Sequence, residues 1–259
     1  MTRFSANLGF LWADLSLLDR IGAAARAGFK AIELHWPYDV PPAAVKEACA
    51  KHELTLLGMN TVVGDAARGE FGLGARPGRE ADFHAAIAQS IAYCLASGAT
   101  SIHAMAGVVA PEQKAEARAT LLRNLAAGAE KAARHNLTLL LEPINPRDKP
   151  GYFYSRADEG AAVIAELGAG NVKLMFDIYH VGVAQGDVLK TFERFLPVIG
   201  HVQIAAVPSR AEPDEGEIAY ERVLRVIDRL GYRGWIGCEY KPRAGADEGL
   251  AWMDAMGFR

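Results

Sequence analysis

Short apolar runs alternate with amphipathic stretches along the whole chain. Several of these runs are hydrophobic at almost every position, which is typical of strands buried on both faces of a parallel sheet. There are eight such runs: RFSANLG at 3–9, AIELHW at 31–36, TLLGMN at 55–60, SIHAMAG at 101–107, LTLLLEPIN at 137–145, VKLMFDIYH at 172–180, IGHVQIAA at 199–206 and WIGCEYKP at 235–242. The pattern therefore predicts eight strands.

The stretches between the runs have helical periodicity. The first carries an apolar stripe that ends at Gly28, a common helix stop, and that consists of Leu15, Leu18, Ile21, Ala24 and Ala25. Longer helical patterns cover residues 79–98, 111–135 and 217–230. Strand–helix alternation predicts an α/β protein with a parallel sheet. A length of 259 residues favours a single (β/α)₈ TIM barrel, one domain covering 1–259, over an open doubly wound sheet, although periodicity alone does not show closure.

Composition narrows the class of protein. Lys and Arg total 28, Asp and Glu total 31, and the net charge is −3, so no nucleic-acid partner is expected. Cys49, Cys94 and Cys238 are odd in number and far apart, which indicates buried thiols in a reducing compartment. No apolar run reaches the roughly 20 residues of a membrane span, and no secretory leader pattern is present. We therefore expect a cytoplasmic protein without a membrane partner.

Two irregular segments follow predicted strands. Residues 61–78, TVVGDAARGEFGLGARPG, follow the third run, and residues 208–217, PSRAEPDEGE, follow the seventh. Long loops in compact domains are often lids or binding loops. We therefore expect both loops to lie near the functional site.

Polar side chains stand where the last four predicted strands end. Glu142 ends LTLLLE, Asp177 ends VKLMFD, Gln203 lies in HVQIA and Glu239 follows WIGC. The active sites of barrels of this type lie at the carboxyl ends of the strands. We therefore expect these four side chains to converge at one mouth of the barrel.

Three converging carboxylates need a counter-charge. A buried carboxylate without a partner costs several kcal/mol, and carboxylates that lie close together also repel one another. A divalent cation resolves both problems, and an all-oxygen ligand set favours Mg²⁺ or Mn²⁺ over Zn²⁺. Strand-end salt bridges or helix caps are the alternative interpretation of each residue taken singly.

His180 lies three residues after Asp177. We interpret it as a hydrogen-bond donor to a substrate oxygen near the metal, the alternative being a polar residue that leaves the strand. His103 and His201 also fall on predicted strands, and His201 is two residues before Gln203, so it is a candidate for supporting that residue.

The order and spacing of several motifs resemble hydroxypyruvate isomerase and 2-oxo-tetronate isomerase, within the xylose-isomerase-like barrel superfamily. The resemblance covers the full length and is strongest in GRE at 78–80, LEPIN at 141–145, FDIYH at 176–180, HVQIA at 201–205, EPDEGEI at 212–218 and WIGCEYKP at 235–242. It implies that Glu142 and Glu239 bind metal and also move protons, and that Asp177 is a metal ligand. Sugar epimerases of the superfamily commonly have His where this chain has Gln203, so epimerase activity does not transfer directly.

The resemblance implies conversion of hydroxypyruvate to 2-hydroxy-3-oxopropanoate (tartronate semialdehyde) through an enediolate. A metal would act as a Lewis acid on the two neighbouring oxygens, with the two Glu residues as acid and base. Because the substrate is a carboxylate, a cation should bind it. Arg210 and Lys241 are the first candidates, and Arg68 and Arg76 in the long loop are the others.

Three alternatives remain open at this stage. A 2-oxo-tetronate isomerase, or a related ketose isomerase or epimerase, differs in the length of its substrate. A DNA repair enzyme of the endonuclease IV type needs more His ligands than this chain offers after the seventh strand. A non-catalytic sugar- or acid-binding barrel would not need two proton carriers. The expected partner is a small-molecule hydroxy-oxo acid, and a homo-oligomer is compatible with the sequence.

Overall fold

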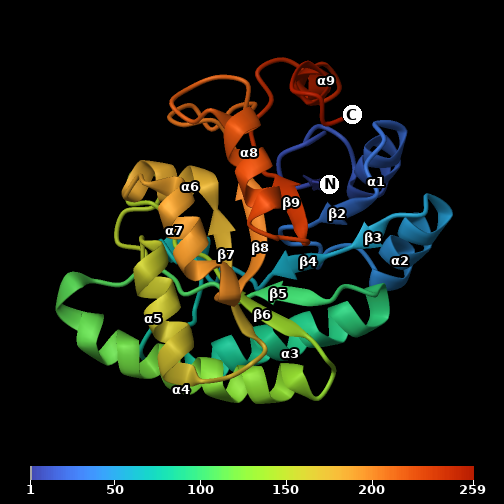
Figure 1. The fold of residues 1–259 in the computed structure, drawn as a ribbon. Coiled ribbons are helices and arrows are strands. Elements are labelled where there is room, and N and C mark those ends of the chain that lie inside the picture. Colours follow the sequence, from blue (N-terminus) through green and yellow to red (C-terminus); the bar gives the residue numbers. More distant parts are fainter. Residues whose placement is uncertain (1) are drawn as a thin grey trace.

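The chain folds into a parallel β-barrel with helices around its outside (Figure 1). The computed structural model describes residues 2–259. Its strands are β1 (Arg3–Asn7), β2 (Ala31–Glu33), β3 (Thr55–Leu56), β4 (Gly58–Asn60), β5 (Ser101–His103), β6 (Thr138–Leu141), β7 (Val172–Asp177), β8 (Ile199–Ile204) and β9 (Trp235–Cys238). They pair in the order β3-β2-β1-β9-β8-β7-β6-β5-β4, and every pairing between them is parallel.

The strand predicted at 55–60 is divided at Leu57, so residues 2–259 hold nine strands where eight were predicted. The backbone N–H of Leu57 donates to Ile32 O at 2.9 Å, and its carbonyl accepts from Ser101 N at 3.0 Å. Glycine at position 58 permits this close approach, because a Cβ there would overlap Ser101. Leu57 therefore joins the β2–β3 pair to the β4–β5 pair. This closure confirms the barrel and excludes the open sheet.

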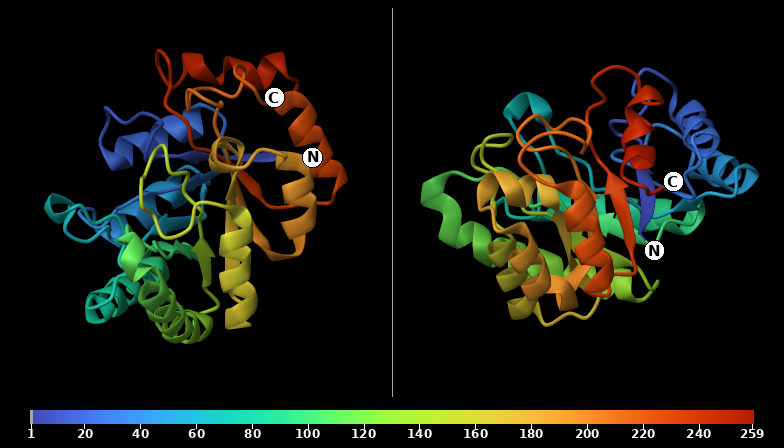
Figure 2. Two further views of the ribbon diagram at one scale, coloured as in Figure 1. Left: turned by 90° about the vertical axis from the view of Figure 1, so that its left-hand side faces the viewer. Right: turned by 45° about the horizontal axis from the view of Figure 1, so that its top comes forward.

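Helices follow the strands and surround the barrel (Figure 2). They are α1 (Leu17–Arg26), α2 (Pro42–Lys51), α3 (Glu80–Ser97), α4 (Lys114–Ala133), α5 (Ala157–Leu167), α6 (Ile178–Ala184), α7 (Val188–Phe195), α8 (Tyr220–Arg229) and α9 (Ala251–Ala255). Short 3-10 turns occur at Ala66–Arg68, Pro111–Gln113, Leu196–Val198 and Glu248–Leu250. The stripe predicted for α1 is wrong at Leu18, which is 40% exposed. Leu17 packs against the core in the first turn instead.

The run predicted as one strand at 172–180 is in fact a strand followed directly by a helix. β7 ends at Asp177 and α6 begins at Ile178. The change occurs because Asp177 caps the helix: its Oδ1 accepts a hydrogen bond from Tyr179 N at 2.8 Å. His180 therefore lies in the first turn of a helix at the mouth of the barrel and not on a strand.

The barrel interior holds polar as well as apolar side chains. Asn7, Glu33, His103, His201 and Gln203 are all buried, although each comes from a strand of the barrel wall. Buried polar groups persist in proteins where hydrogen bonds satisfy them. In residues 2–259, no helix combines the length and apolarity needed to cross a membrane.

Candidate active site

A cavity of about 690 Å³ opens at the carboxyl ends of the strands. The predicted site residues Glu142, His180, Arg210, Glu239 and Lys241 all line it. Aromatic rings form much of the remaining wall, contributed by Phe10, Trp36, Phe71 and Tyr179. Cavities of this kind, mostly apolar with a few convergent charges, are the usual binding sites for small molecules.

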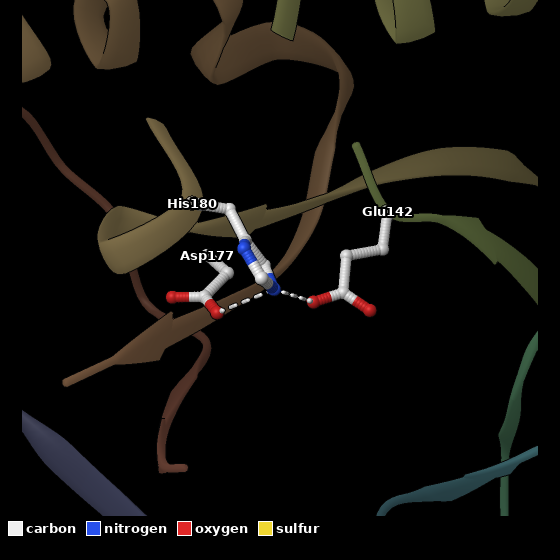
Figure 3. A group of neighbouring side chains, drawn as sticks. All are labelled: Glu142, Asp177 and His180. Carbon is white, nitrogen blue, oxygen red and sulfur yellow. Dashed lines mark ion pairs between the residues drawn. The ribbon is translucent and has the colours of Figure 1, made fainter. Parts of the chain in front are cut away.

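Glu142, Asp177 and His180 lie close together, and Glu142 and His180 line this cavity (Figure 3). The Nε2 atom of His180 lies 3.6 Å from Glu142 Oε1 and 3.6 Å from Asp177 Oδ2. One ligand atom from each of the three residues lies within 4.8 Å of the others, which is close enough for a metal ion to be held between them. All three side chains are buried.

The hydrogen bonds of His180 determine which of its nitrogens carries the proton. Asn145 donates to Nδ1 through its backbone N–H at 3.3 Å and through its side-chain Nδ2 at 2.7 Å. Nδ1 is therefore the unprotonated acceptor, and the hydrogen is on Nε2, which faces the carboxylates. Burial lowers the pKa of His180 to about 3, so the ring is neutral. This arrangement suits a hydrogen-bond donor better than a metal ligand.

Burial disfavours the ionised forms of Glu142 and Asp177. It raises the pKa of Glu142 well above the usual range, and the nearby charges of Glu239 and Asp177 raise it further. Burial and the charge of Glu239 also raise the pKa of Asp177, to about 7. A bound cation would offset both effects, because it stabilises the ionised carboxylates.

Glu239 has different surroundings within the same cavity. Its Oε1 accepts hydrogen bonds from His35 Nε2 at 2.9 Å and Asn7 Nδ2 at 3.1 Å, and its Oε2 accepts one from Arg210 Nη2 at 3.0 Å. Burial alone would raise the pKa of Glu239, but the His35 hydrogen bond and the Arg210 charge outweigh it and lower that pKa to about 2. Glu239 is therefore ionised.

Arg210 is held rigidly above this carboxylate. Its guanidinium lies 5.0 Å from the ring centroids of Phe10 and Tyr179, and it also pairs with Asp148 at 2.9 Å. Burial disfavours its charge, but the surrounding carboxylates, above all Glu239, raise the pKa of Arg210 above its usual value. The backbone at this residue has φ +60°, a left-handed conformation that is uncommon outside glycine. Such local strain recurs at binding sites.

The other predicted cations have different positions. Lys241 lines the cavity but is exposed, and its backbone N–H donates to Arg210 O at 2.8 Å. Arg76 pairs with the buried Glu70 and donates to Val108 O at 2.8 Å, so it supports the 61–78 loop. Neither Arg76 nor Arg68 lines the cavity. Of the predicted cations, Arg210 is therefore the best placed for an anionic substrate. Arg147 and Lys149, which sequence reasoning missed, also line the cavity.

Gln203 does not line the main cavity, unlike Glu142 and Glu239. It lines a small space of about 20 Å³ beneath the main cavity, and it pairs in register with Asp177 on the neighbouring strand. Two buried oxygens here, Gln203 Oε1 and Asp177 Oδ2, have no hydrogen-bond partner in the described structure. Unpaired buried acceptors are unusual and indicate a missing donor or cation. These oxygens therefore fit a divalent cation.

Sequence reasoning missed residues contributed by the first half of the barrel. Asn7 and His35 contact Glu239, and His103 lies with its Nδ1 3.4 Å from Glu142 Oε2. The signal was present, because His35 follows AIEL in the second apolar run just as Glu239 follows WIGC in the last.

Comparison with known proteins defines the family. The family model described as xylose isomerase-like TIM barrel matches residues 21–256. The chain belongs to this family. A 2-oxo-tetronate isomerase from Cupriavidus necator is 47% identical, over 98% of both chains. A putative human hydroxypyruvate isomerase is 41% identical over 97% of this chain and 94% of the relative, and hydroxypyruvate isomerase of Escherichia coli is 38% identical over 98% and 99%. These relatives of the family are isomerases, and the resemblance found in the motifs is confirmed.

Solved structures agree on the fold. A protein from Brucella melitensis described as an AP endonuclease of family 2 superposes with a TM-score of 0.96 at 37% identity, over 98% of this chain and 99% of that one. A 3-keto-D-glucoside 4-epimerase from Escherichia coli superposes with a TM-score of 0.80 at 18% identity, over 98% and 99%. The second likeness concerns the fold alone.

Proposed function

We propose that this protein is a metal-assisted isomerase of short hydroxy-oxo acids, converting hydroxypyruvate to 2-hydroxy-3-oxopropanoate in the cytoplasm. The observation that carries the proposal is the presence of two carboxyl groups, Glu142 and Glu239, on the wall of one cavity that is also lined by the half-buried Arg210. Moving a carbonyl between adjacent carbons requires exactly two proton transfers at carbon, one away and one back. Names of the family relatives support the same reaction class.

The residues of the cavity divide this work between them. Arg210 binds the substrate carboxylate, exchanging its present contacts with Glu239 and Asp148 for the ligand. The Nε2–H of His180 donates to a substrate oxygen. One of the two Glu carboxylates takes a proton from C3 of hydroxypyruvate, and a carboxyl group returns a proton to C2. The hydroxyl proton moves from the oxygen on C3, which becomes the aldehyde oxygen, to the oxygen on C2, which becomes the hydroxyl. The aromatic wall excludes water while the enediolate exists.

We infer that the metal ligands are Glu142, Asp177, Gln203 and Glu239. The unpaired oxygens of Asp177 and Gln203 and the raised pKa of Glu142 support three of these ligands. Glu239 is included because of the resemblance to the xylose isomerase-like family, since the ligand atoms that lie within 4.8 Å of one another belong to Glu142, Asp177 and His180. Oxygen donors favour Mg²⁺ or Mn²⁺. When bound, such an ion supplies Lewis-acid stabilisation of the negative charge that develops on the substrate oxygens.

A 2-oxo-tetronate isomerase is the second candidate. Two observations favour it: the 47% identical relative carries that name, and the cavity of about 690 Å³ is larger than a three-carbon acid needs. The same residues would perform both reactions, because only the far end of the substrate differs.

An isomerisation assay on hydroxypyruvate and 2-oxo-tetronate tests this function. Protein dialysed against a chelator should lose activity, and added Mg²⁺ or Mn²⁺ should restore it. Turnover that is indifferent to chelator would contradict the metal site, and no turnover of either acid would contradict the reaction. Duplex DNA with an abasic site completes the panel, since cleavage there would favour the activity named for the Brucella melitensis protein.

A further inference from the structure

Glu33 is a buried carboxylate that the proposed reaction does not use. It is the last residue of β2 and is 5% exposed. It lines the small space beneath the main cavity and is absent from the wall of the main cavity itself. Burying a carboxylate is costly unless donors surround it. The groups that face Glu33 therefore indicate what it does.

Three side chains from two other strands, β1 and β8, converge on this carboxylate. His201 Nε2 lies 2.5 Å from Glu33 Oε2. Asn7 Nδ2 and Gln203 Nε2 lie 3.4 Å and 3.5 Å from Glu33 Oε1. Glycine at position 237 leaves room for this arrangement, because a Cβ there would overlap Glu33 Oε1.

The Oε1 atom of Glu33 accepts from the side-chain nitrogens that face it, so it selects which end of a neighbouring amide turns toward it. The amide nitrogen of Gln203 faces Glu33, and its Oε1 is therefore turned away, buried and without a partner. This is the orientation in which Gln203 offers an oxygen to a cation. With its nitrogen outward, the same side chain would offer only N–H groups, which cannot bind a metal.

Asn7 links Glu33 to a second residue of the site, Glu239. Its Nδ2 donates to Glu239 Oε1 at 3.1 Å as well as facing Glu33, and its Oδ1 accepts from Gly9 N at 2.9 Å. The Asn7 amide is thus fixed at both ends. Glu33 therefore contacts Gln203 directly and is linked to Glu239 through Asn7.

We propose that Glu33 is a positioning residue that orients Gln203 directly, and Glu239 through Asn7, for binding a divalent cation. The inference rests on the proposed function only in taking Gln203 and Glu239 as ligands. Residues that support metal ligands in this way typically change metal affinity about 10–100-fold when they are removed. Glu33 therefore acts on the metal site without touching substrate.

Titration of metal-free protein with Mn²⁺ by calorimetry tests the proposal without recourse to activity. The variant Glu33→Leu removes every acceptor oxygen and keeps most of the side-chain volume, so its Mn²⁺ affinity should fall about 10–100-fold. Glu70→Leu is the matched control, because Glu70 is equally buried but pairs with Arg79 and Arg76, away from the site. It should lower stability and leave Mn²⁺ affinity within about twofold of the wild-type value.

The outcomes distinguish the proposal of a metal site from the proposal that Glu33 positions its ligands. Wild-type protein that does not bind Mn²⁺ overturns the metal site itself. Wild-type protein that binds Mn²⁺, together with a folded Glu33→Leu variant of equal affinity, overturns only the role of Glu33. A double-mutant cycle excludes a general structural effect, because Glu33→Leu should cost less affinity in a Gln203→Ala background than in the wild type. If the losses of Mn²⁺ affinity in the two single variants were strictly additive in the double variant, Glu33 would not act through Gln203.

A second variant covers the case in which Glu33→Leu does not fold. Glu33→Asp keeps a buried carboxyl group but withdraws it by one methylene, which lengthens its already long contacts to Asn7 and Gln203. Its Mn²⁺ affinity should fall about 10-fold. An unchanged affinity, or a crystal structure of the Mn²⁺ complex with Glu33 out of reach of both amides, would overturn the proposal.

Discussion

Glu142 and Glu239 are the same residue type in one cavity, but their surroundings act on them in opposite directions. Burial and neighbouring negative charges raise the pKa of Glu142, whereas His35 and Arg210 lower the pKa of Glu239. Environments that separate the pKa values of two carboxyl groups are a common feature of acid–base pairs. The cavity therefore holds one carboxyl group that readily keeps a proton and one that readily stays ionised.

A single substitution tests the need for the second carboxyl group. Glu239→Gln keeps the shape of the side chain and removes its ability to exchange a proton, so kcat should fall roughly 10²–10⁴-fold. Glu130→Gln, on the exposed face of α4, is the control and should leave kcat unchanged. Matching circular dichroism spectra of both variants would show that the fold is intact. Wild-type turnover by Glu239→Gln would contradict its role as a proton carrier.

At the scale of elements, glycine residues make room for the polar contacts of the site. Gly9, in the segment after β1, lies against His35, and a Cβ at position 9 would overlap the imidazole ring. His35 donates to Glu239. The backbone of one strand–helix connection therefore determines whether a side chain from the next connection can reach Glu239.

Gly9→Ala should therefore lower activity without removing any functional group. The added methyl displaces His35 from Glu239, and the hydrogen bond lost is worth about 1.5–3 kcal/mol, or roughly 10–100-fold in kcat/KM. Gly170→Ala is a matched control, because a Cβ there meets nothing within 4 Å. Equal kcat/KM values for the two alanine variants would show that His35 is not needed at Glu239.

The sequence predicts the elements better than it predicts their ends. Burial on both faces gives strands a continuous apolar signal, so the runs mark the barrel wall, and helical periodicity locates α3 and α4 closely. The break at Leu57 depends on hydrogen bonds to two different strands, which no local pattern encodes. The helix that carries His180 was missed because IYHV is as apolar as a strand.

Local reasoning also found only part of the site. Carboxylates after apolar runs are conspicuous because they are costly to bury, which is why Glu142 and Glu239 were identified. Glu33 lies in an equally apolar run, but its importance depends on amides from distant strands, which only the closed barrel brings together.

At the scale of the whole molecule, the three thiols are enclosed by the packed layers between strands and helices. Cys49, Cys94 and Cys238 are free and buried. Burial raises the pKa of Cys49 to about 11 and that of Cys94 to about 12, and it also raises the pKa of Cys238 well above its usual value. Their reactivity therefore reports on opening of the fold.

Native protein at pH 8 should react negligibly with a thiol reagent such as Ellman's reagent over minutes, because both burial and the raised pKa values suppress the thiolate. Protein unfolded in guanidinium chloride should release the signal of all 3 thiols. Rapid labelling of one cysteine without denaturant would show that the barrel opens locally at that residue. Reducing agent should leave the melting temperature unchanged, since no disulfide is present among residues 2–259.

The pairing of β1 with β9 makes the barrel a ring in which the first strand has no special place. Arg3 stands opposite Trp235, and both described ends of the chain, Thr2 and Arg259, line one small pocket on the outside of the barrel. A short linker joining these ends, with a new start in the loop after α3 or α4, would therefore preserve every strand pairing. Such a circular permutant should fold and keep its Mn²⁺ affinity, so the order of the strand–helix units along the gene is separable from the architecture of the enzyme.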